Sequence, residues 1–292
     1  MSSQLQFAPA AVPAPAARPW RLAVLGALVL LAYAPVLAQL SAQWWREPDY
    51  SHGFLVPVFC AYVLWQRMDA LRTVEARPSW TGLVVLAASV CLLFLGTAGA
   101  ELFLQRVSLI GVLAGLVLWF WGCAMLRAAA FPLLALLLMV PLPGIIYYQI
   151  VFPLQVVASQ LATGILHVLN LFPVARESNI LVLNSTRLEV AEACSGLRSL
   201  LSLLTLAVMY SYFAERRAAI RAILWVLVLP IAVAGNAARV VFAAISVELG
   251  GASAVEGWAH TLSGLFLFFL STLLLMLCHA ALRRVWPAER GA

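Results

Sequence analysis

Residues 220–248 read IRAILWVLVLPIAVAGNAARVVFAAISVE. This stretch is apolar, and Arg239 is its one charged residue between Ala222 and Val247. It is longer than the roughly 20 residues that an α-helix needs to cross a bilayer, so we expect a membrane-spanning helix here. Because a guanidinium inside a bilayer is energetically costly, Arg239 is a candidate functional residue. The alternative is a structural arginine paired with Glu248 or with a carbonyl.

The rest of the chain is equally poor in charge. Of its 292 residues, 10% are charged and 64% are hydrophobic, whereas about a quarter are charged in an ordinary globular domain. A water-soluble protein of this size cannot bury so much apolar surface. The composition therefore excludes a soluble enzyme, a nucleic-acid-binding protein and a disordered protein, and it predicts an all-α polytopic membrane protein.

The chain divides into three predicted parts. Residues 1–19 are rich in Ala and Pro and are expected to be disordered. Residues 20–284 form a single transmembrane domain, and residues 285–292 form a short cytoplasmic tail after which we expect no further domain. The five cysteines contain no C-x-x-C pair, so we expect neither a metal site nor a cofactor.

The arginines predict the topology of the chain. All 18 basic residues are arginine, and twelve of them fall on one side if the N-terminus is cytoplasmic and eight apolar runs cross the membrane. Nine crossings would put the Arg216–Arg221 cluster outside. The nine apolar runs are Leu22–Leu40, Phe54–Gln66, Trp80–Ala98, Leu104–Cys123, Ala128–Ile146, Tyr147–Phe172, Leu197–Phe213, Ile220–Glu248 and Thr261–Leu282.

One run is therefore not expected to cross. Tyr147–Phe172 carries an uncharged polar stripe from Ser159 onward, at three- and four-residue spacing. We expect it to lie in the outer interface or to enter the membrane re-entrantly, with its stripe toward a cavity. The alternative is that Ala128–Ile146 does not cross. The prediction is thus about eight transmembrane helices and one interfacial or re-entrant helix.

A more polar segment, Pro173–Glu192, precedes the seventh run. Ile180–Leu183 and Thr186–Ala191 flank Asn184-Ser185, a pattern typical of a small β-hairpin with a two-residue turn. The topology puts this hairpin on the periplasmic side. It is expected either to hold the following helix start in place or to dock a peptide by strand addition.

Cys194 follows this polar segment, at the start of the next predicted helix. Unpaired amides and the helix dipole favour negative charge at this position, which lowers the pKa of a thiol. Arg198, four residues later, is expected to supply a cation to that thiol or to pair with Glu192. The alternative is an inert cysteine at the membrane surface.

Two further residues fall on the same side as Cys194. His260 lies directly ahead of the last run, and Asn236 shares a helix face with Arg239, whose guanidinium it is expected to orient. A thiol, a guanidinium and an imidazole supply a nucleophile, a charge stabiliser and a general acid and base. Together they predict acyl transfer.

Four segments resemble the exosortase family. They are EACSGLRSL at 192–200, GNAARVV at 235–241, His260 ahead of the last run, and DYSHGFLVP at 49–57. Archaeosortases are a more distant match. The resemblance implies a multi-pass enzyme of the bacterial inner membrane, with Cys194 as the nucleophile and Arg239 and His260 as its catalytic partners. Asp49 and His52 either support the site or belong to a loop motif.

The resemblance also implies a substrate. Exosortases act as cysteine transpeptidases on secreted proteins with a C-terminal PEP-CTERM tail, which is a Pro-Glu-Pro motif, a transmembrane helix and basic residues. They are associated with exopolysaccharide biosynthesis. The expected partners are such proteins, an unidentified acceptor nucleophile and membrane lipids, with no nucleic acid. The alternatives are a transporter that binds an anion at Arg239, a protease with water as the acceptor, and a non-catalytic export scaffold.

Overall fold

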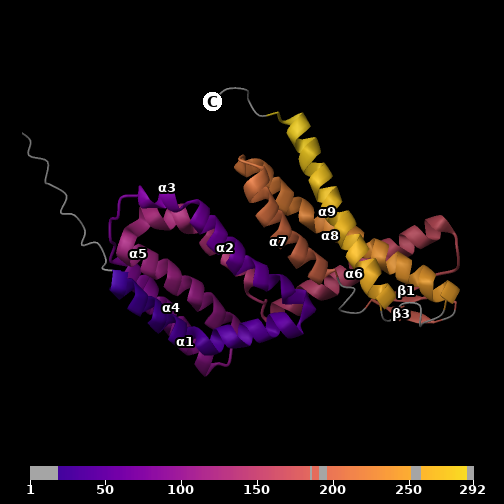
Figure 1. Cartoon of the computed structure of the whole chain (residues 1–292). Coiled ribbons are helices and arrows are strands. Elements are labelled where there is room, and N and C mark those ends of the chain that lie inside the picture. Colours follow the sequence, from indigo (N-terminus) through magenta and orange to yellow (C-terminus); the bar gives the residue numbers. More distant parts are fainter. Residues whose placement is uncertain (1–18, 185, 191–195, 251–257, 288–292) are drawn as a thin grey trace, which may run out of the picture. The chain divides into compact units, whose positions relative to one another are not determined.

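The computed structural model describes residues 19–184, 186–190, 196–250 and 258–287. These residues are almost all helical (Figure 1), so the prediction of an all-α polytopic membrane protein is confirmed. The elements in order are α1 (Pro19–Arg46), η1 (Pro48–Phe54), α2 (Leu55–Gln66), α3 (Met68–Arg72), α4 (Thr81–Ala98), α5 (Leu102–Ala135), η2 (Leu136–Met139), α6 (Gly144–Leu169), β1 (Ala175–Glu177), β2 (Ile180–Val182), β3 (Arg187–Glu189), α7 (Leu197–Ala214), α8 (Ala218–Gly250) and α9 (Trp258–Val285).

Seven helices in the described part of the chain are long and apolar enough to cross a membrane, where about eight crossing helices were predicted. The run Phe54–Gln66 gives the 12-residue helix α2, which is too short. Two other predicted runs fall in one candidate, Leu102–Met139, because helical structure resumes directly after a kink at Gly122. Arg127 therefore lies within α5 and not in a loop.

The chain folds as two compact units, and the predicted single transmembrane domain over 20–284 stays a prediction. The first unit comprises the described residues up to Ser41 and Cys60–Val140. Its α4 and α5 pack together, and α1 joins them through a small core of Tyr33, Val36, Leu109 and Val112. A hydrogen bond between the Tyr33 hydroxyl and Ser108 Oγ, 2.9 Å long, also joins α1 to α5.

The second unit comprises Ala42–Phe59 and the described residues from Pro141 onward. Its helices α7, α8 and α9 pack against one another, and α6 packs against α8. Side chains at every third or fourth position bury one face of each helix, because this period matches 3.6 residues per turn. The shared core of α7, α8 and α9 includes Leu203, Leu224, Val228 and Leu275.

The predicted hairpin is confirmed as β2 and β3, with Leu181 opposite Leu188. Sequence analysis missed a third antiparallel strand, β1, which pairs with the other edge of β2 and gives the order β1-β2-β3. Leu181 is fully buried in a core that includes Leu166 of α6 and Val240 of α8. The sheet is therefore packed against the helix that carries Arg239.

The polar stripe of α6 was predicted to face a cavity, but it faces this sheet. Ser159 Oγ donates to the Ser178 carbonyl at 2.8 Å, and His167 Nε2 donates to the Val174 carbonyl at 2.8 Å. Thr163 bonds within its own helix, to the Ser159 carbonyl. These side chains hold the irregular backbone around β1. The 26-residue α6 is long enough to span a membrane, and its interfacial or re-entrant position stays a prediction.

Candidate active site

Helix α8 contributes two buried polar residues on one face. Arg239 is 8% exposed and Asn236 is 4% exposed, and their three-residue spacing puts them about one turn apart. The neighbours of Arg239 on the sheet side, Val240 and Val241, belong to the core that packs against β2. The sheet and α8 therefore form a rigid support for the Arg239 side chain.

The start of α7 lies directly against Asn236. Gly196 is the N-cap residue of α7 and has φ +81°, in the left-handed region that glycine adopts without steric cost. A Cβ on Gly196 would lie 3.0 Å from Cβ and Cγ of Asn236. Cys194, two residues earlier in the chain, and Glu192 lie outside the described residues. The segment that follows Cys194 thus contacts α8 one turn before Arg239.

Helix α9 reaches the same side chain from another direction. A Cβ on Gly264 would lie 2.7 Å from Nη2 of Arg239 and 3.2 Å from its Cζ, so the guanidinium packs on the bare backbone of α9. His260 lies in the first turn of α9, four residues before Gly264, although its side chain is outside the described part of the structure. Four residues are about one helical turn.

A cavity of about 280 Å³ opens at this junction. Its walls come from η1, the first two turns of α7, the middle of α8 and the first half of α9. The lining residues are Pro48, Ser51, Arg198, Ser199, Ser202, Arg239, Gly264, Leu265 and Phe268. A lining that combines guanidinium and hydroxyl groups with apolar side chains suits a peptide with a polar main chain and an apolar flank.

Asp49 joins three elements beside this cavity. Its Oδ1 accepts a hydrogen bond from Arg198 Nε at 2.6 Å, which makes an ion pair, and its Oδ2 accepts one from the Tyr147 hydroxyl at 3.0 Å. The sequence predicted Cys194 or Glu192 as the partner of Arg198; both lie outside the described residues, and the described partner is Asp49. We call Asp49, Tyr147, Arg198 and Arg239 the cavity cluster.

Among the expected and missed positions, His52 lies apart from the cavity. His52 is buried in η1 and is not among the residues that line the cavity. Sequence analysis missed Tyr147, Ser199, Ser202 and Gly264. Of these, Gly264 had a signal, its four-residue distance from His260. Among the described residues, no group of three His, Cys, Asp or Glu side chains has the arrangement of a metal site.

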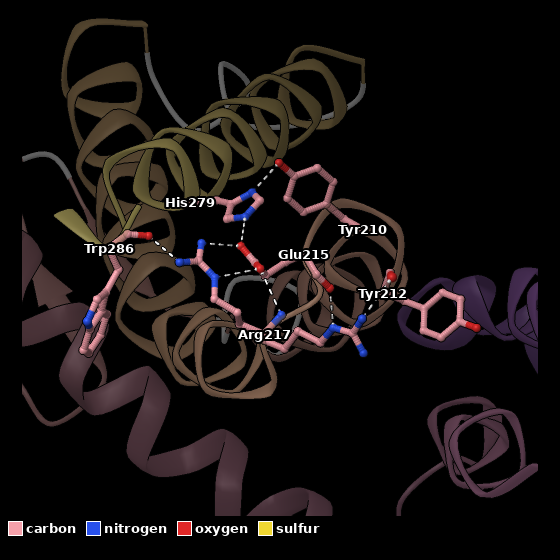
Figure 2. A network of polar contacts seen from close by, with 7 residues as sticks. Tyr210, Tyr212, Glu215, Arg217, His279 and Trp286 are labelled. Carbon is pink, nitrogen blue, oxygen red and sulfur yellow. Dashed lines mark hydrogen bonds and ion pairs between the residues drawn. The ribbon is translucent and has the colours of Figure 1, made fainter. Parts of the chain in front are cut away.

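A second polar cluster lies at the other end of α7 (Figure 2). Glu215 is 6% exposed and accepts hydrogen bonds from Nε and Nη2 of Arg217, both at 3.0 Å, and from Nε2 of His279 at 3.3 Å. His279 Nδ1 bonds to the Tyr210 hydroxyl at 2.8 Å. We call Tyr210, Glu215, Arg217 and His279 the closed cluster, because its members bond to one another.

Electrostatics within the closed cluster favour the ionised carboxylate. The hydrogen bonds from Arg217 lower the pKa of Glu215 to about 2, against the opposing effect of burial. Arg217 also donates to the Trp286 carbonyl just beyond the end of α9. The closed cluster therefore ties the α7–α8 connection to the C-terminal end of α9.

Comparison with protein-family models gave a match. Residues 44–277, most of the chain, match the family model described as transmembrane exosortase. This range includes η1, the start of α7, Arg239 and the first half of α9, which together surround the cavity. Neither the comparison with curated proteins nor the comparison with solved structures gave a match.

Proposed function

The chain belongs to the transmembrane exosortase family, and we propose that it is a cysteine transpeptidase that removes the C-terminal sorting tail of exported proteins. Family membership supports a membrane transpeptidase role in protein sorting in general. The finer proposal is that the substrates carry a PEP-CTERM tail and that Cys194, Arg239 and His260 perform the reaction. The proposal includes a link to exopolysaccharide-associated surface sorting.

One observation carries this proposal. The chain around Cys194 and the chain around His260 both converge on one buried face of α8, through the contacts of Gly196 with Asn236 and of Gly264 with Arg239. Asn236 and Arg239 are 40 or more positions away from Gly196 in the sequence. A fold that brings these segments to one cavity is what a shared reaction would need, whereas three incidental motifs need no common site.

The first step is attack by Cys194 on a peptide carbonyl of the substrate. A bond forms between Sγ and the carbonyl carbon, and the carbonyl oxygen gains negative charge that the guanidinium of Arg239 stabilises. The C–N bond then breaks, and the leaving amine takes a proton from the His260 imidazolium. The products are a thioester on Cys194 and the released tail.

The second step transfers the acyl group to an acceptor. Neutral His260 removes a proton from the acceptor amine or hydroxyl, which attacks the thioester carbonyl. The C–S bond breaks and the Cys194 thiolate is regenerated, with the proton left on His260. Since the cavity has a half-exposed Arg198 on its wall, its mouth is accessible to such an acceptor.

The positions of the arginines support the orientation that we propose. Arg216, Arg217, Arg221, Arg283 and Arg284 lie at the ends of α7, α8 and α9 farthest along these helices from the cavity. Arginine in short connections is a mark of the cytoplasmic side. We therefore propose a bacterial inner-membrane protein with cytoplasmic termini and a cavity that faces the periplasm.

The test is mass spectrometry of a tagged PEP-CTERM protein from cells that express the full chain or its Cys194→Ala variant. We expect loss of the tail only with the wild-type chain, and a mass on the new C-terminus that identifies the acceptor. A new C-terminus with no added mass identifies water as the acceptor and overturns the transpeptidase.

A matched control is the Cys91→Ala variant, which removes an exposed cysteine on α4. It should process the substrate at the wild-type rate. Tail removal that continues in a membrane-inserted Cys194→Ala variant would exclude Cys194 as the nucleophile.

A further inference from the structure

The side chain of Asp49 in η1 bonds to both α6 and α7. Its two carboxylate oxygens are divided between them: Oδ1 accepts from Arg198 in the first turn of α7, and Oδ2 accepts from Tyr147 in the first turn of α6. The carboxylate side chain is 17% exposed, so solvent screens these contacts less than it screens a surface ion pair. Asp49 thus fixes two helix starts to one point.

The element that carries Asp49 is itself firmly held. Tyr50 and His52 of η1 are buried, and the backbone of Gly53 lies so close to Trp44 that a Cβ there would be 2.4 Å from the indole Nε1. Pro48 at the start of η1 further restricts its backbone. The anchor for Arg198 is therefore a rigid one, as positioning requires.

The neighbours of Asp49 form the wall of the cavity. Pro48 and Ser51 line it from η1, and Arg198, Ser199 and Ser202 line it from α7. Asp49 itself is not on the lining. Its bonds set the distance between these two walls. Because Nε of Arg198 donates to Asp49, Arg198 does not have all of its N–H groups available for a bound substrate.

We propose that Asp49 is a positioning residue, and that Asp49, Arg198 and Tyr147 clamp the start of α7 against η1 and α6. The clamp holds the helix start that follows Cys194 at a fixed place beside Arg239. It also neutralises the charge of Arg198, so that Arg198 acts through Asp49 and not on the reacting atoms. The catalytic benefit rests on the proposed function, whereas the clamp itself does not.

The experiment uses the full chain in detergent or nanodiscs with the Asp49→Asn and Tyr147→Phe variants. Each removes one charge or one hydroxyl and keeps the side-chain shape. Glu47→Gln and Tyr148→Phe are matched controls, because Glu47 and Tyr148 are exposed neighbours that make neither contact. Two quantities are measured: amide hydrogen exchange along α7, and kcat and KM of tail cleavage per folded molecule.

The clamp predicts faster exchange in residues 197–204 of both variants and unchanged exchange in residues 207–214. It also predicts a kcat about 10- to 100-fold lower in Asp49→Asn, because a small displacement of a reacting group has effects of that size, with KM within about threefold. A purely structural role would reduce the amount of folded protein and leave kcat per folded molecule unchanged. The controls should match the wild type.

A double variant separates the clamp from direct catalysis by Arg198. If the two residues act as one unit, Asp49→Asn with Arg198→Gln has a kcat no lower than the worse single variant. Three results would each overturn the clamp: losses of kcat that multiply in the double variant, unchanged amide exchange in Asp49→Asn, or a wild-type kcat in Asp49→Asn. If the wild-type chain cleaves no tail, the proposed function fails, and the exchange measurement still decides whether Asp49 holds α7.

Discussion

The cavity cluster and the closed cluster lie at opposite ends of α7, about 27 Å apart along a helix of 18 residues. Both hold a carboxylate and an arginine in an ion pair, Asp49 with Arg198 and Glu215 with Arg217. In the closed cluster, Glu215 is surrounded by donors from the protein itself (Figure 2). In the cavity cluster, Arg198 and Arg239 also border a space of about 280 Å³.

This difference shows how to separate a structural polar cluster from a functional one in a membrane protein. Both clusters contain buried charged groups, so burial of charge does not show which cluster is structural and which is functional. Arg106 in α5 makes the same point, since it is 4% exposed and lies in the other unit. What distinguishes the cavity cluster is space for a ligand beside the charged groups. Substitutions in the two clusters should therefore have different effects on activity and on stability.

The Arg239→Lys variant should lose the most activity. Lysine keeps the charge but loses the planar set of donors, so tail cleavage should fall about 100-fold or more. The measurement is the rate of tail loss from a PEP-CTERM substrate at equal enzyme. Arg72→Lys, at an arginine whose side chain is 74% exposed, is the control and should be fully active. An active Arg239→Lys enzyme would reduce Arg239 to a structural role.

The Gly264→Ala variant should displace Arg239 without removing it. A Cβ at this position would lie 2.7 Å from Nη2, so the guanidinium must shift. We expect tail cleavage to fall about 10-fold, because misplacement of a catalytic group is costly even when its chemistry is intact. Gly164→Ala in α6, where a Cβ meets nothing within 4 Å, is the matched control. Equal activities of the two variants would contradict the contact.

The Glu215→Gln variant should lose stability and keep its cleavage activity, whereas the Arg239→Lys and Gly264→Ala variants should lose activity. It leaves Arg217 and His279 without their carboxylate partner, so we expect the thermal unfolding midpoint to fall by about 5 °C. The cleavage rate per folded molecule should stay within about twofold of the wild type. Thermal unfolding in detergent, followed by the activity of the folded fraction, measures both. A large fall in that rate at unchanged stability would make the closed cluster a functional site.

The closed cluster should also make the stability of the folded protein depend on pH in the acid range. The pKa of Glu215 is lowered to about 2 from an ordinary value of 4.5. A lowered pKa stabilises the folded state fully above the unfolded value, and this contribution is lost as the pH falls from 4.5 toward 2. Unfolding midpoints between pH 7 and pH 3 should therefore fall less in Glu215→Gln than in the wild type. Parallel curves would contradict the assignment.

Much of the fold could be predicted from local sequence. The length and apolarity of residues 220–248 predicted α8, and the segments on either side of Asn184-Ser185 predicted the strands β2 and β3. The crossing helices were harder to count. At Gly122 the backbone has φ +82° for a single residue and then becomes helical again, and no residue spacing indicates this. Strand β1, Ala175-Arg176-Glu177, is three residues long, and its sequence has no alternation of apolar and polar residues to mark it.

The candidate site was predicted in part. Cys194, Arg239 and His260 were named from their motifs and their charge in an apolar context, and their catalytic roles stay predictions. The partner of Arg198 was not found, because Asp49 lies 149 positions away and Tyr147 lies 98 positions from Asp49. Such pairs depend on how helices pack in three dimensions, and a single sequence contains no local pattern for them.

The most direct test of the central claim is a search for the acyl-enzyme itself. The full chain would be incubated with a tail peptide, quenched in acid and digested, and each cysteine peptide would be weighed by mass spectrometry. We expect a substrate-derived thioester on Cys194 and on none of Cys60, Cys91, Cys123 and Cys278. Tail cleavage with no adduct on Cys194, or with an adduct on another cysteine, would contradict it.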